Sequence, residues 1–405
     1  MAETLAQATP KKANYRWLVI LLALAVIVSI ILVYAENRVY EPANPFLGGS
    51  GDHVHAFAID PFQGQHMYMG THYGFFRTGD GGQAWTRLTG NGGVPSTLIV
   101  TSLTISPVDH QITYATGYDL DSGNASGIYV TTDDGANWQS LPTGGAEQLP
   151  DPRILFVTAG WADAQEAYTY SITSGLYQTL DTGKHWQQVA PAFTGQVTSF
   201  TPFLNCGGTT VTALTGKQCP ENFLVGTTKG LFIGQATNTG IHFDPINQVS
   251  SYVYAVTIHR STPLTFYAST QEGLFRANSP TEPYTAVSSV AQGAPTLTSI
   301  SISGGDVALL YGITKNNEVQ RSHDGGQTWQ GIGSSLLNRG LSQLSSGLRS
   351  ATGSNTPQWA GGQNVFLTLL QTPATNSTEV YAAISFPNQL FYSSQNGTNW
   401  REIHG

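Results

Sequence analysis

After residue 52, apolar and polar residues alternate in short runs, the period-2 pattern that predicts half-buried β-strands. Seven such runs each open a repeating unit, and they are His55–Ile59, Val100–Ser106, Ile154–Ala159, Val197–Pro202, Val253–His259, Leu297–Ser303 and Val365–Leu370. A glycine followed by an apolar and an aromatic or second apolar residue marks a later strand, at Gly74, Gly127, Gly175, Gly230 and Gly273, with degenerate copies at Glu318–Gln320 and Gln389–Phe391. Both signals count seven units, which predicts an all-β, seven-bladed β-propeller over residues 53–405. A six-bladed ring with one extra hairpin is the alternative.

An octapeptide separates the last two predicted strands in five of the units, and it is absent from units four and five. Its hydroxyl, Asp, Gly and Trp positions are Thr78, Asp80, Gly82, Trp85; Thr131, Asp133, Gly135, Trp138; Thr179, Asp181, Gly183, Trp186; Ser322, Asp324, Gly326, Trp329; and Ser393, Gly397, Trp400, where Gln395 replaces the Asp. An Asp carboxylate accepts hydrogen bonds from the N–H groups that follow it, a Gly adopts positive φ at low cost, and a Trp buries a large ring. We therefore expect a tight structural turn at each copy.

This octapeptide resembles the Asp-box of the bacterial neuraminidase repeat family, S/T-x-D-x-G-x-x-W. The resemblance implies that the turns lie between the third and fourth strands of a blade, on the face of the propeller opposite the ligand. Sialidases, xyloglucanases, photosystem II assembly and stability factors and sortilin-type receptors carry similar propellers. The resemblance is specific for the fold and unspecific for the activity, because propellers host many functions.

Two kinds of enzyme in this group are tested by the sequence. Sialidases carry an early Phe/Tyr-Arg-Ile-Pro motif, whereas Pro152–Ile154 has the wrong order, and Arg77, Arg276 and Arg321 lie in or beside third strands. Xyloglucanases set two propellers face to face, each supplying one carboxylate for acid–base chemistry. We therefore expect a non-catalytic scaffold without a cofactor, which binds a protein or glycan ligand. A glycoside hydrolase, sialidase-like or xyloglucanase-like, is the alternative.

The N-terminal region predicts a membrane anchor. Residues 17–35 are 19 residues without a charge, long enough to cross a bilayer as a helix. Lys11, Lys12 and Arg16 precede this segment, so the positive-inside rule places residues 1–16 in the cytoplasm and the propeller outside it. Residues 36–52, with Pro42 and Pro45, read as a linker. A cleaved leader peptide is the alternative to an anchor.

Composition and cysteine content limit the kinds of partner and metal site that we expect. Only 10% of residues are charged and the net charge is −8 without a basic cluster, so we expect no nucleic-acid partner. Cys206 and Cys219 are the two cysteines, and outside the cytoplasm they are expected to pair, with two free thiols as the alternative. No Cys/His spacing typical of a metal site is present.

Two insertions, Gly117–Ser126 and Ser334–Gly362, interrupt the repeat on the expected ligand face. Long loops on a rigid scaffold often carry binding residues. The candidate ligand-binding residues lie after predicted second strands and are His72, Tyr73, Tyr118, Asp119, Asp121, Lys229, Glu272, Lys315 and Asn316. A calcium loop at Asp119–Asn124 competes with a solvated turn, and a metal pair at His53 and His55 competes with ordinary surface histidines.

Overall fold

The computed structural model describes residues 54–61, 63–72, 74–121, 125–141, 149, 154–206, 219–237, 239–260, 263–280, 282–316, 318–332, 366–371, 378–385 and 389–403. The chain divides into two compact units, Met1–Ala43 and Asn44–Gly405, and every described residue belongs to the second. None of the described residues forms a helix long and apolar enough to span a membrane. The predicted tail 1–16, anchor 17–35 and linker 36–52 lie outside the described residues.

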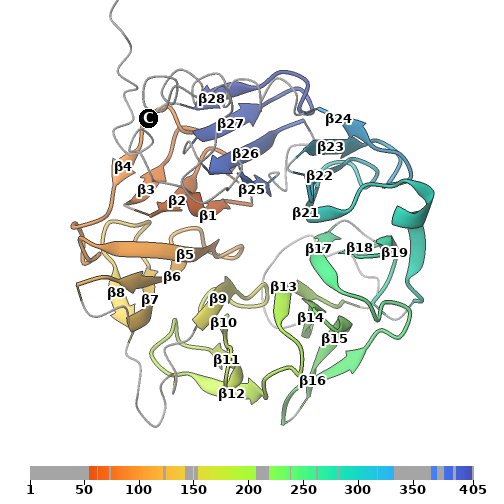
Figure 1. Ribbon diagram of the computed structural model, residues 1–405. Coiled ribbons are helices and arrows are strands. Elements are labelled where there is room, and N and C mark those ends of the chain that lie inside the picture. The colour runs from red at the N-terminus through yellow and green to blue at the C-terminus, as the bar shows by residue number, and fades with distance from the viewer. Residues whose placement is uncertain are drawn as a thin grey trace, which may run out of the picture. The chain divides into compact units, whose positions relative to one another are not determined.

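Seven four-stranded antiparallel sheets stand around a ring, and each sheet is one blade (Figure 1). Blades 1 and 2 are β1 (Val54–Ile59), β2 (Met67–Thr71), β3 (Phe75–Thr78), β4 (Thr86–Arg87) and β5 (Leu98–Ile105), β6 (Thr113–Asp119), β7 (Ala125–Thr131), β8 (Gln139–Leu141). Blades 3 and 4 are β9 (Ile154–Ala159), β10 (Ala167–Ser171), β11 (Gly175–Thr179), β12 (Gln187–Ala190) and β13 (Val197–Leu204), β14 (Glu221–Thr227), β15 (Gly230–Thr237), β16 (Gly240–Pro245).

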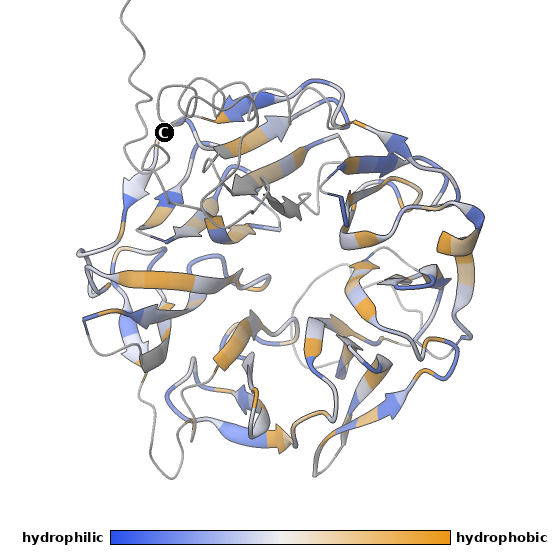
Figure 2. Cartoon of the chain, viewed as in Figure 1, coloured by the Kyte–Doolittle hydropathy of each residue, from blue (hydrophilic) through white to orange (hydrophobic). Residues whose placement is uncertain are grey.

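Blades 5 and 6 are β17 (Val253–His259), β18 (Thr265–Thr270), β19 (Gly273–Ala277), β20 (Thr285–Ser289) and β21 (Leu297–Ile302), β22 (Leu310–Thr314), β23 (Val319–Ser322), β24 (Gln330–Gly331). Blade 7 is β25 (Phe366–Gln371), β26 (Val380–Ser385), β27 (Gln389–Ser393), β28 (Arg401–Ile403). A 3₁₀ turn, Val290–Gln292, follows β20. Within every blade the strands pair in chain order with the first strand innermost, which confirms the predicted seven-bladed propeller. Apolar segments run along first strands such as β5 and β9 (Figure 2).

The first strands lie where the alternation predicts them, to within two residues at each end. The interpretation of Gly117–Ser126 as a loop was wrong. β6 and β7 continue pairing through Tyr118↔Ser126 and Asp119↔Ala125, so both ends of this insertion extend the hairpin as strand. The extension is paired on its other side as well, because β5 begins two residues early and Leu98 pairs with Asp119. The second insertion, Ser334–Gly362, lies outside the described residues.

Each octapeptide connects the third and fourth strands of its blade as a hydrogen-bonded turn. In the third copy, Thr179 Oγ1 donates to Asp181 Oδ1 at 2.9 Å, and that oxygen accepts the His185 N–H at 2.9 Å. The Gly183 N–H donates to Thr179 Oγ1 at 2.8 Å. The same three bonds recur in the copies of blades 1, 2 and 6. In the last copy the backbone oxygen of Gln395 accepts the Thr398 N–H instead.

The octapeptide turns also fasten each blade to the blade before it. Trp186 of blade 3 is buried among Ile112, Ile128 and Leu141 of blade 2. In the same way, Trp138 of blade 2 meets Phe75 of blade 1 with ring centroids 4.9 Å apart. Burial of the octapeptide Trp at these seams therefore adds apolar stabilisation between blades that share no backbone ladder.

Blades 4 and 5 lack the octapeptide, and other aromatic residues fill the equivalent space. Tyr284, just before β20, is buried with Leu231 and Ile246 of blade 4. Phe243, in β16, packs against the cluster that contains Leu176 of blade 3. An aromatic ring in or just before the fourth strand thus packs at these seams without the turn.

Side-chain contacts, without strand pairing, close the ring between blade 7 and blade 1 in the described part of the chain. Phe57 and Met69 of blade 1 share one core cluster with Tyr381 and Ile403 of blade 7. The Tyr381 hydroxyl also donates to the backbone oxygen of Gly64 at 3.3 Å. Each blade is built from consecutive strands, so the two ends of the ring meet through side chains.

Candidate ligand-binding face

The propeller has two faces, which are set by the antiparallel order of its strands. The octapeptide turns and the connections between first and second strands lie on one side, here called the turn face. The hairpins between second and third strands, and the connections between blades, lie on the other side, here called the hairpin face. Cys206 and Cys219 form the predicted disulfide in the β13–β14 connection, on the turn face.

The hairpin face carries every predicted ligand-binding residue that the structure describes. His72, Lys229, Glu272, Lys315 and Asn316 lie at the hairpins of blades 1, 4, 5 and 6. Tyr118, Asp119 and Asp121 lie together at the hairpin of blade 2, and Tyr73 lies outside the described residues. The structure therefore brings together three of these residues and distributes the others around the rim.

Asp119 holds its own hairpin in place. Its Oδ1 accepts the Thr97 hydroxyl at 2.6 Å and the Asp121 N–H at 3.3 Å. These bonds tie the tip of β6 to the segment that leads into β5. The described residues contain no group of three His, Cys, Asp or Glu side chains placed to hold a metal ion. Residues 122–124 of the considered calcium loop lie outside the described residues.

His55 lies beside His72, and the sequence did not predict this contact. Its Nε2 lies 3.4 Å from Nδ1 of His72, across the start of blade 1. The ring centroids are 5.6 Å apart. His53, the other half of the considered metal pair, lies outside the described residues.

Most of the large exposed apolar side chains of the described residues lie on the hairpin face, and only Tyr118 among them was predicted to bind a ligand. Of the six large exposed apolar side chains in the described chain, four belong to its hairpins and connections: Tyr118 (39% exposed), Leu120 (46%), Ile172 (56%) and Tyr252 (36%). Leu155 (39%) adjoins them near the start of β9. Leu120 and Ile172 are apolar residues at the tips of hairpins, and such residues are the sequence signal that could have predicted this surface.

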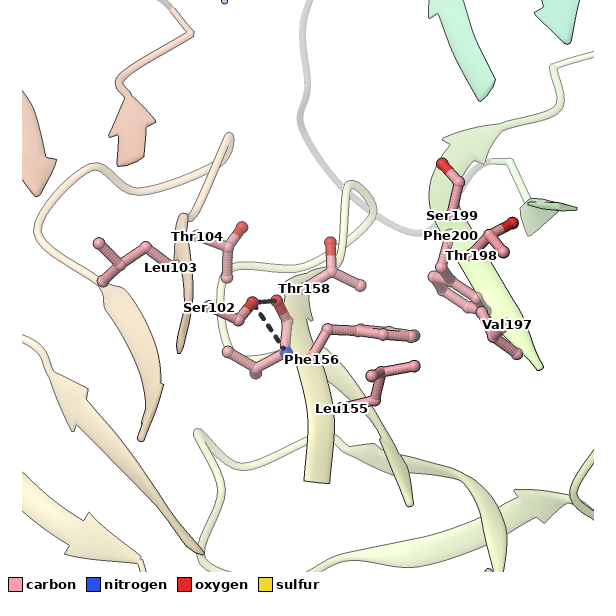
Figure 3. A pocket seen from close by; sticks show the side chains of 11 residues that line it. Ser102, Leu103, Thr104, Leu155, Phe156, Thr158, Val197, Thr198, Ser199 and Phe200 are labelled. Atoms are coloured by element: carbon pink, nitrogen blue, oxygen red, sulfur yellow. Dashed lines mark hydrogen bonds between the residues drawn. The ribbon is translucent and has the colours of Figure 1, made fainter. Parts of the chain in front are cut away.

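A cavity of about 420 Å³ lies in the ring between β5, β9 and β13, the first strands of blades 2, 3 and 4 (Figure 3). Leu155, Phe156, Val197 and Phe200 gather on one side of it. Thr104, Thr158 and Ser199 add hydroxyl groups to the lining, together with the apolar Leu103 and Val157. No charged side chain of the described chain lines this cavity.

A buried polar cluster joins blades 3, 4 and 5 on the turn face. The Trp161 N–H donates to Glu221 Oε1 at 2.8 Å, and the Tyr168 hydroxyl donates to Glu166 Oε1 at 2.5 Å. Burial, reinforced by the charge of Glu166, raises the pKa of Glu221 to about 8. The Arg260 guanidinium lies 3.4 Å from the centroid of the Trp161 ring. Both carboxyl groups are buried and bonded to protein groups, so this pair fits a structural tie better than a catalytic pair across an open cleft.

These features define the class of protein as a seven-bladed β-propeller with an uncharged cavity and an apolar hairpin face. Among solved structures, YCF48 bound to D1 peptide is similar, with a TM-score of 0.54 and 13% identity over 84% of this chain and 91% of that chain. YCF48 from Cyanidioschyzon merolae is similar at a TM-score of 0.55 and 13% identity, over 84% and 95%. The Niastella koreensis GH74 enzyme is similar at a TM-score of 0.61 and 16% identity, over 87% of this chain and 54% of that chain. At these identities the likeness establishes the fold alone.

Sequence comparison adds one short match. A probable oligoxyloglucan-reducing end-specific xyloglucanase of Neosartorya fischeri is 30% identical over 99 residues, which are 24% of this chain. The match spans 11% of the length of that curated relative. No family model matches the chain, so the Asp-box family remains a resemblance of the octapeptides.

Proposed function

We propose that this protein is a non-catalytic scaffold that binds an extended segment of a partner protein on its hairpin face. The observation that carries the proposal is that four large exposed apolar side chains, Tyr118, Leu120, Ile172 and Tyr252, lie on that face. Exposed apolar groups rimmed by polar residues are typical of interaction surfaces. Aromatic residues among them are frequent energetic centres of such surfaces.

The charge of this face suits a segment of low net charge. In the described hairpins, the two lysines Lys229 and Lys315 offset half of the four acidic residues, which are Asp119, Asp121, Glu272 and Glu318. The remaining two negative charges are spread over several blades and leave a weak, mixed field. Neither strong steering nor strong repulsion follows from such a distribution. The printed name of one structural neighbour, YCF48 bound to D1 peptide, adds support for a peptide ligand on a propeller of this kind.

The proposal includes attachment to a membrane through residues 17–35, with the propeller outside the cytoplasm. The charge asymmetry around this segment supports that orientation, and the Cys206–Cys219 disulfide suits an oxidising compartment. Cysteine-accessibility labelling of intact cells tests the orientation. A single Cys placed at Ser279 should react with a membrane-impermeant reagent, and labelling only after lysis would contradict the proposed topology.

The binding test uses a displayed random peptide library selected on the full chain. A Leu120→Asp/Ile172→Asp variant places two charges in the apolar surface and should lose at least tenfold in affinity for selected peptides. Leu180→Asp is the matched control, because Leu180 is 62% exposed in an octapeptide turn on the other face. Peptides that bind all three proteins alike would contradict the proposal.

Glycoside hydrolysis remains the second candidate, because the xyloglucanase match and the GH74 neighbour favour it. The seven first strands, however, contain no Asp or Glu residue to serve as acid or base toward the channel. A screen of the full chain with xyloglucan oligosaccharides and sialosides separates the two candidates. Turnover above that of a heat-denatured sample would establish an enzyme and displace the scaffold reading.

A further inference from the structure

The cavity lies at the seam where the inner wall of the ring is built differently from its neighbours. Between blades 2 and 3, Ser102 Oγ accepts the Val157 N–H at 3.3 Å and donates to the Val157 carbonyl at 3.4 Å. Between blades 4 and 5, the Ser199 hydroxyl accepts the Val256 N–H at 3.2 Å. These hydroxyl bridges hold first strands of adjacent blades together.

Between blades 3 and 4, a contact between aromatic rings replaces the hydroxyl bridges among the described residues. The ring centroids of Phe156 and Phe200 are 4.9 Å apart, and Phe156 also stacks on Tyr170 at 6.0 Å with an interplanar angle of 7°. The cavity lies between β5, β9 and β13, so its lining combines the hydroxyl bridges of blades 2 and 3 with the aromatic rings at the seam between blades 3 and 4.

The hydroxyl groups of the lining can still donate hydrogen bonds. Thr104 Oγ1 accepts the Ala159 N–H at 3.3 Å, and Ser199 Oγ accepts a backbone N–H as described above. A hydroxyl that accepts retains its own O–H for a further bond. An occupant with an apolar body and one polar tip can therefore satisfy both sides. A charged occupant would lose its hydration without gaining a counter-charge, which is costly.

The cavity adjoins the apolar surface of the hairpin face. Strands β9 and β13 both start from that face, so Leu155 and Val197 lie near the mouth. Leu155 is itself one of the exposed apolar residues, and Ile172 lies on the hairpin of the same blade. A segment bound across blades 2 and 3 would thus pass over the mouth.

We propose that this cavity receives an uncharged aromatic side chain with a polar tip, of the tyrosine or tryptophan kind, from the bound segment. The inference rests on the proposed function and specifies what its partner must contain. Phe156 and Phe200 contact the ring, while Thr104 and Thr158 lie on the hydroxyl side that takes the polar tip. The apolar surface around the mouth favours a polypeptide over a neutral sugar, which would need polar groups there.

The first test measures side-chain analogues by ligand-observed NMR on the full chain. p-Cresol should bind to the wild type, whereas 4-hydroxyphenylacetate, which carries a carboxylate, should not. Thr158→Phe fills the cavity and should reduce the p-cresol signal at least fivefold. Thr298→Phe is the matched control, because Thr298 is exposed on the first strand of blade 6 and does not line the cavity. Leu155→Ser, at the exposed mouth, is a second variant in case Thr158→Phe does not fold, and it should also weaken binding.

Two results overturn the assignment. Equal p-cresol signals from the wild type and a folded cavity variant would contradict the proposal that the cavity binds an aromatic side chain. Binding of methyl β-glucoside that Thr158→Phe abolishes would assign the cavity to a neutral sugar instead.

The second test separates this inference from the proposed function. Peptides selected on the wild type should contain an aromatic residue, and its replacement by Lys should weaken binding at least tenfold. If Thr158→Phe binds these peptides normally while Leu120→Asp/Ile172→Asp does not, the scaffold stands and the cavity inference falls. If both variants bind normally, both fall.

Discussion

At the third octapeptide turn, two successive residues adopt left-handed backbone conformations, with φ of 64° at Thr182 and 88° at Gly183. A β-carbon at Gly183 would lie 2.3 Å from Cδ1 of Leu141 in the preceding blade. Glycine is therefore favoured at position 183 for two reasons: its backbone is left-handed, and Leu141 of the preceding blade occupies the space of a β-carbon. The tight turn and the packing of two blades depend on the same missing side chain.

Gly183→Ala is expected to lower the free energy of unfolding by about 2–4 kcal/mol, from left-handed strain and from crowding of Leu141. Urea denaturation followed by Trp fluorescence measures the change. Gly79→Ala is the matched control, since a β-carbon at Gly79 meets no atom within 4 Å. A loss as large in the control as at Gly183 would show that the seam contact is irrelevant.

Glu221 makes stability depend on pH. Its pKa is raised from 4.5 to about 8 in the folded protein by burial and by Glu166, so folding favours the protonated form. This contribution is complete below pH 4.5 and is lost as the pH rises through 8, because the folded state must then hold a buried charge. Stability should therefore decline across that interval.

Glu221→Gln should flatten this decline between pH 5 and 8, since the amide N–H can donate to Glu166 without titrating. Thermal melts across that range measure the effect. Glu272→Gln, at an exposed hairpin, is the control and should follow the wild-type profile. An unchanged slope in Glu221→Gln would assign the dependence to other groups.

At the scale of strands and turns, all seven blades are four-stranded sheets, but two different arrangements supply the aromatic ring near the fourth strand. Five use an octapeptide with its Trp, while blades 4 and 5 use Phe243 and Tyr284. What the seam requires is an aromatic ring against the previous blade, because it fills space that no backbone pairing covers. The hydrogen-bonded turn is one way to present that ring.

Tyr284→Ala should accordingly cost about 3–4 kcal/mol of stability, as for truncation of a buried aromatic residue. Tyr252→Ala provides the same change at a 36% exposed position on the hairpin face. The control should melt like the wild type and bind selected peptides less tightly. If Tyr284→Ala also melts like the wild type, the equivalence of Tyr284 and the octapeptide Trp is wrong.

For the whole molecule, the decisive contact is the closure between blades 7 and 1. Ile403, in the last strand of blade 7, is buried in the cluster that also contains Phe57 and Met69 of blade 1. No strand pairing joins blade 7 to blade 1 among the described residues, so side-chain contacts hold this closure. Weakening this one seam should open a ring whose other seams are intact.

Ile403→Ala should lower stability by about 2–4 kcal/mol through the cavity that it leaves. Hydrogen exchange should increase first in β1, β2 and β26, which flank the closure. Leu180→Ala, at an exposed position, is the control. Increased exchange spread evenly over all seven blades would argue against a single closing seam.

Much of the fold and less of the candidate site were predictable from the sequence. Strands such as Ile154–Ala159 and Val253–His259 were located to the residue, because alternation and turn chemistry are local properties. The Gly117–Ser126 region was misread, since its polar composition resembles a loop while pairing with an extended β5 holds it as strand. Ile172 and Tyr252 were missed, because exposure depends on what the rest of the chain covers.

The sequence by itself determined the number of blades, the positions of their strands and the chemistry of the octapeptide turns, because each depends on a few neighbouring residues. Only the tertiary structure decided which blade receives each Trp, how Glu221 meets Glu166, and which apolar side chains stay uncovered around the cavity of Phe156 and Phe200. Those contacts join residues about one blade or more apart along the chain. Their geometry is set by the closing of the ring, which no local pattern encodes.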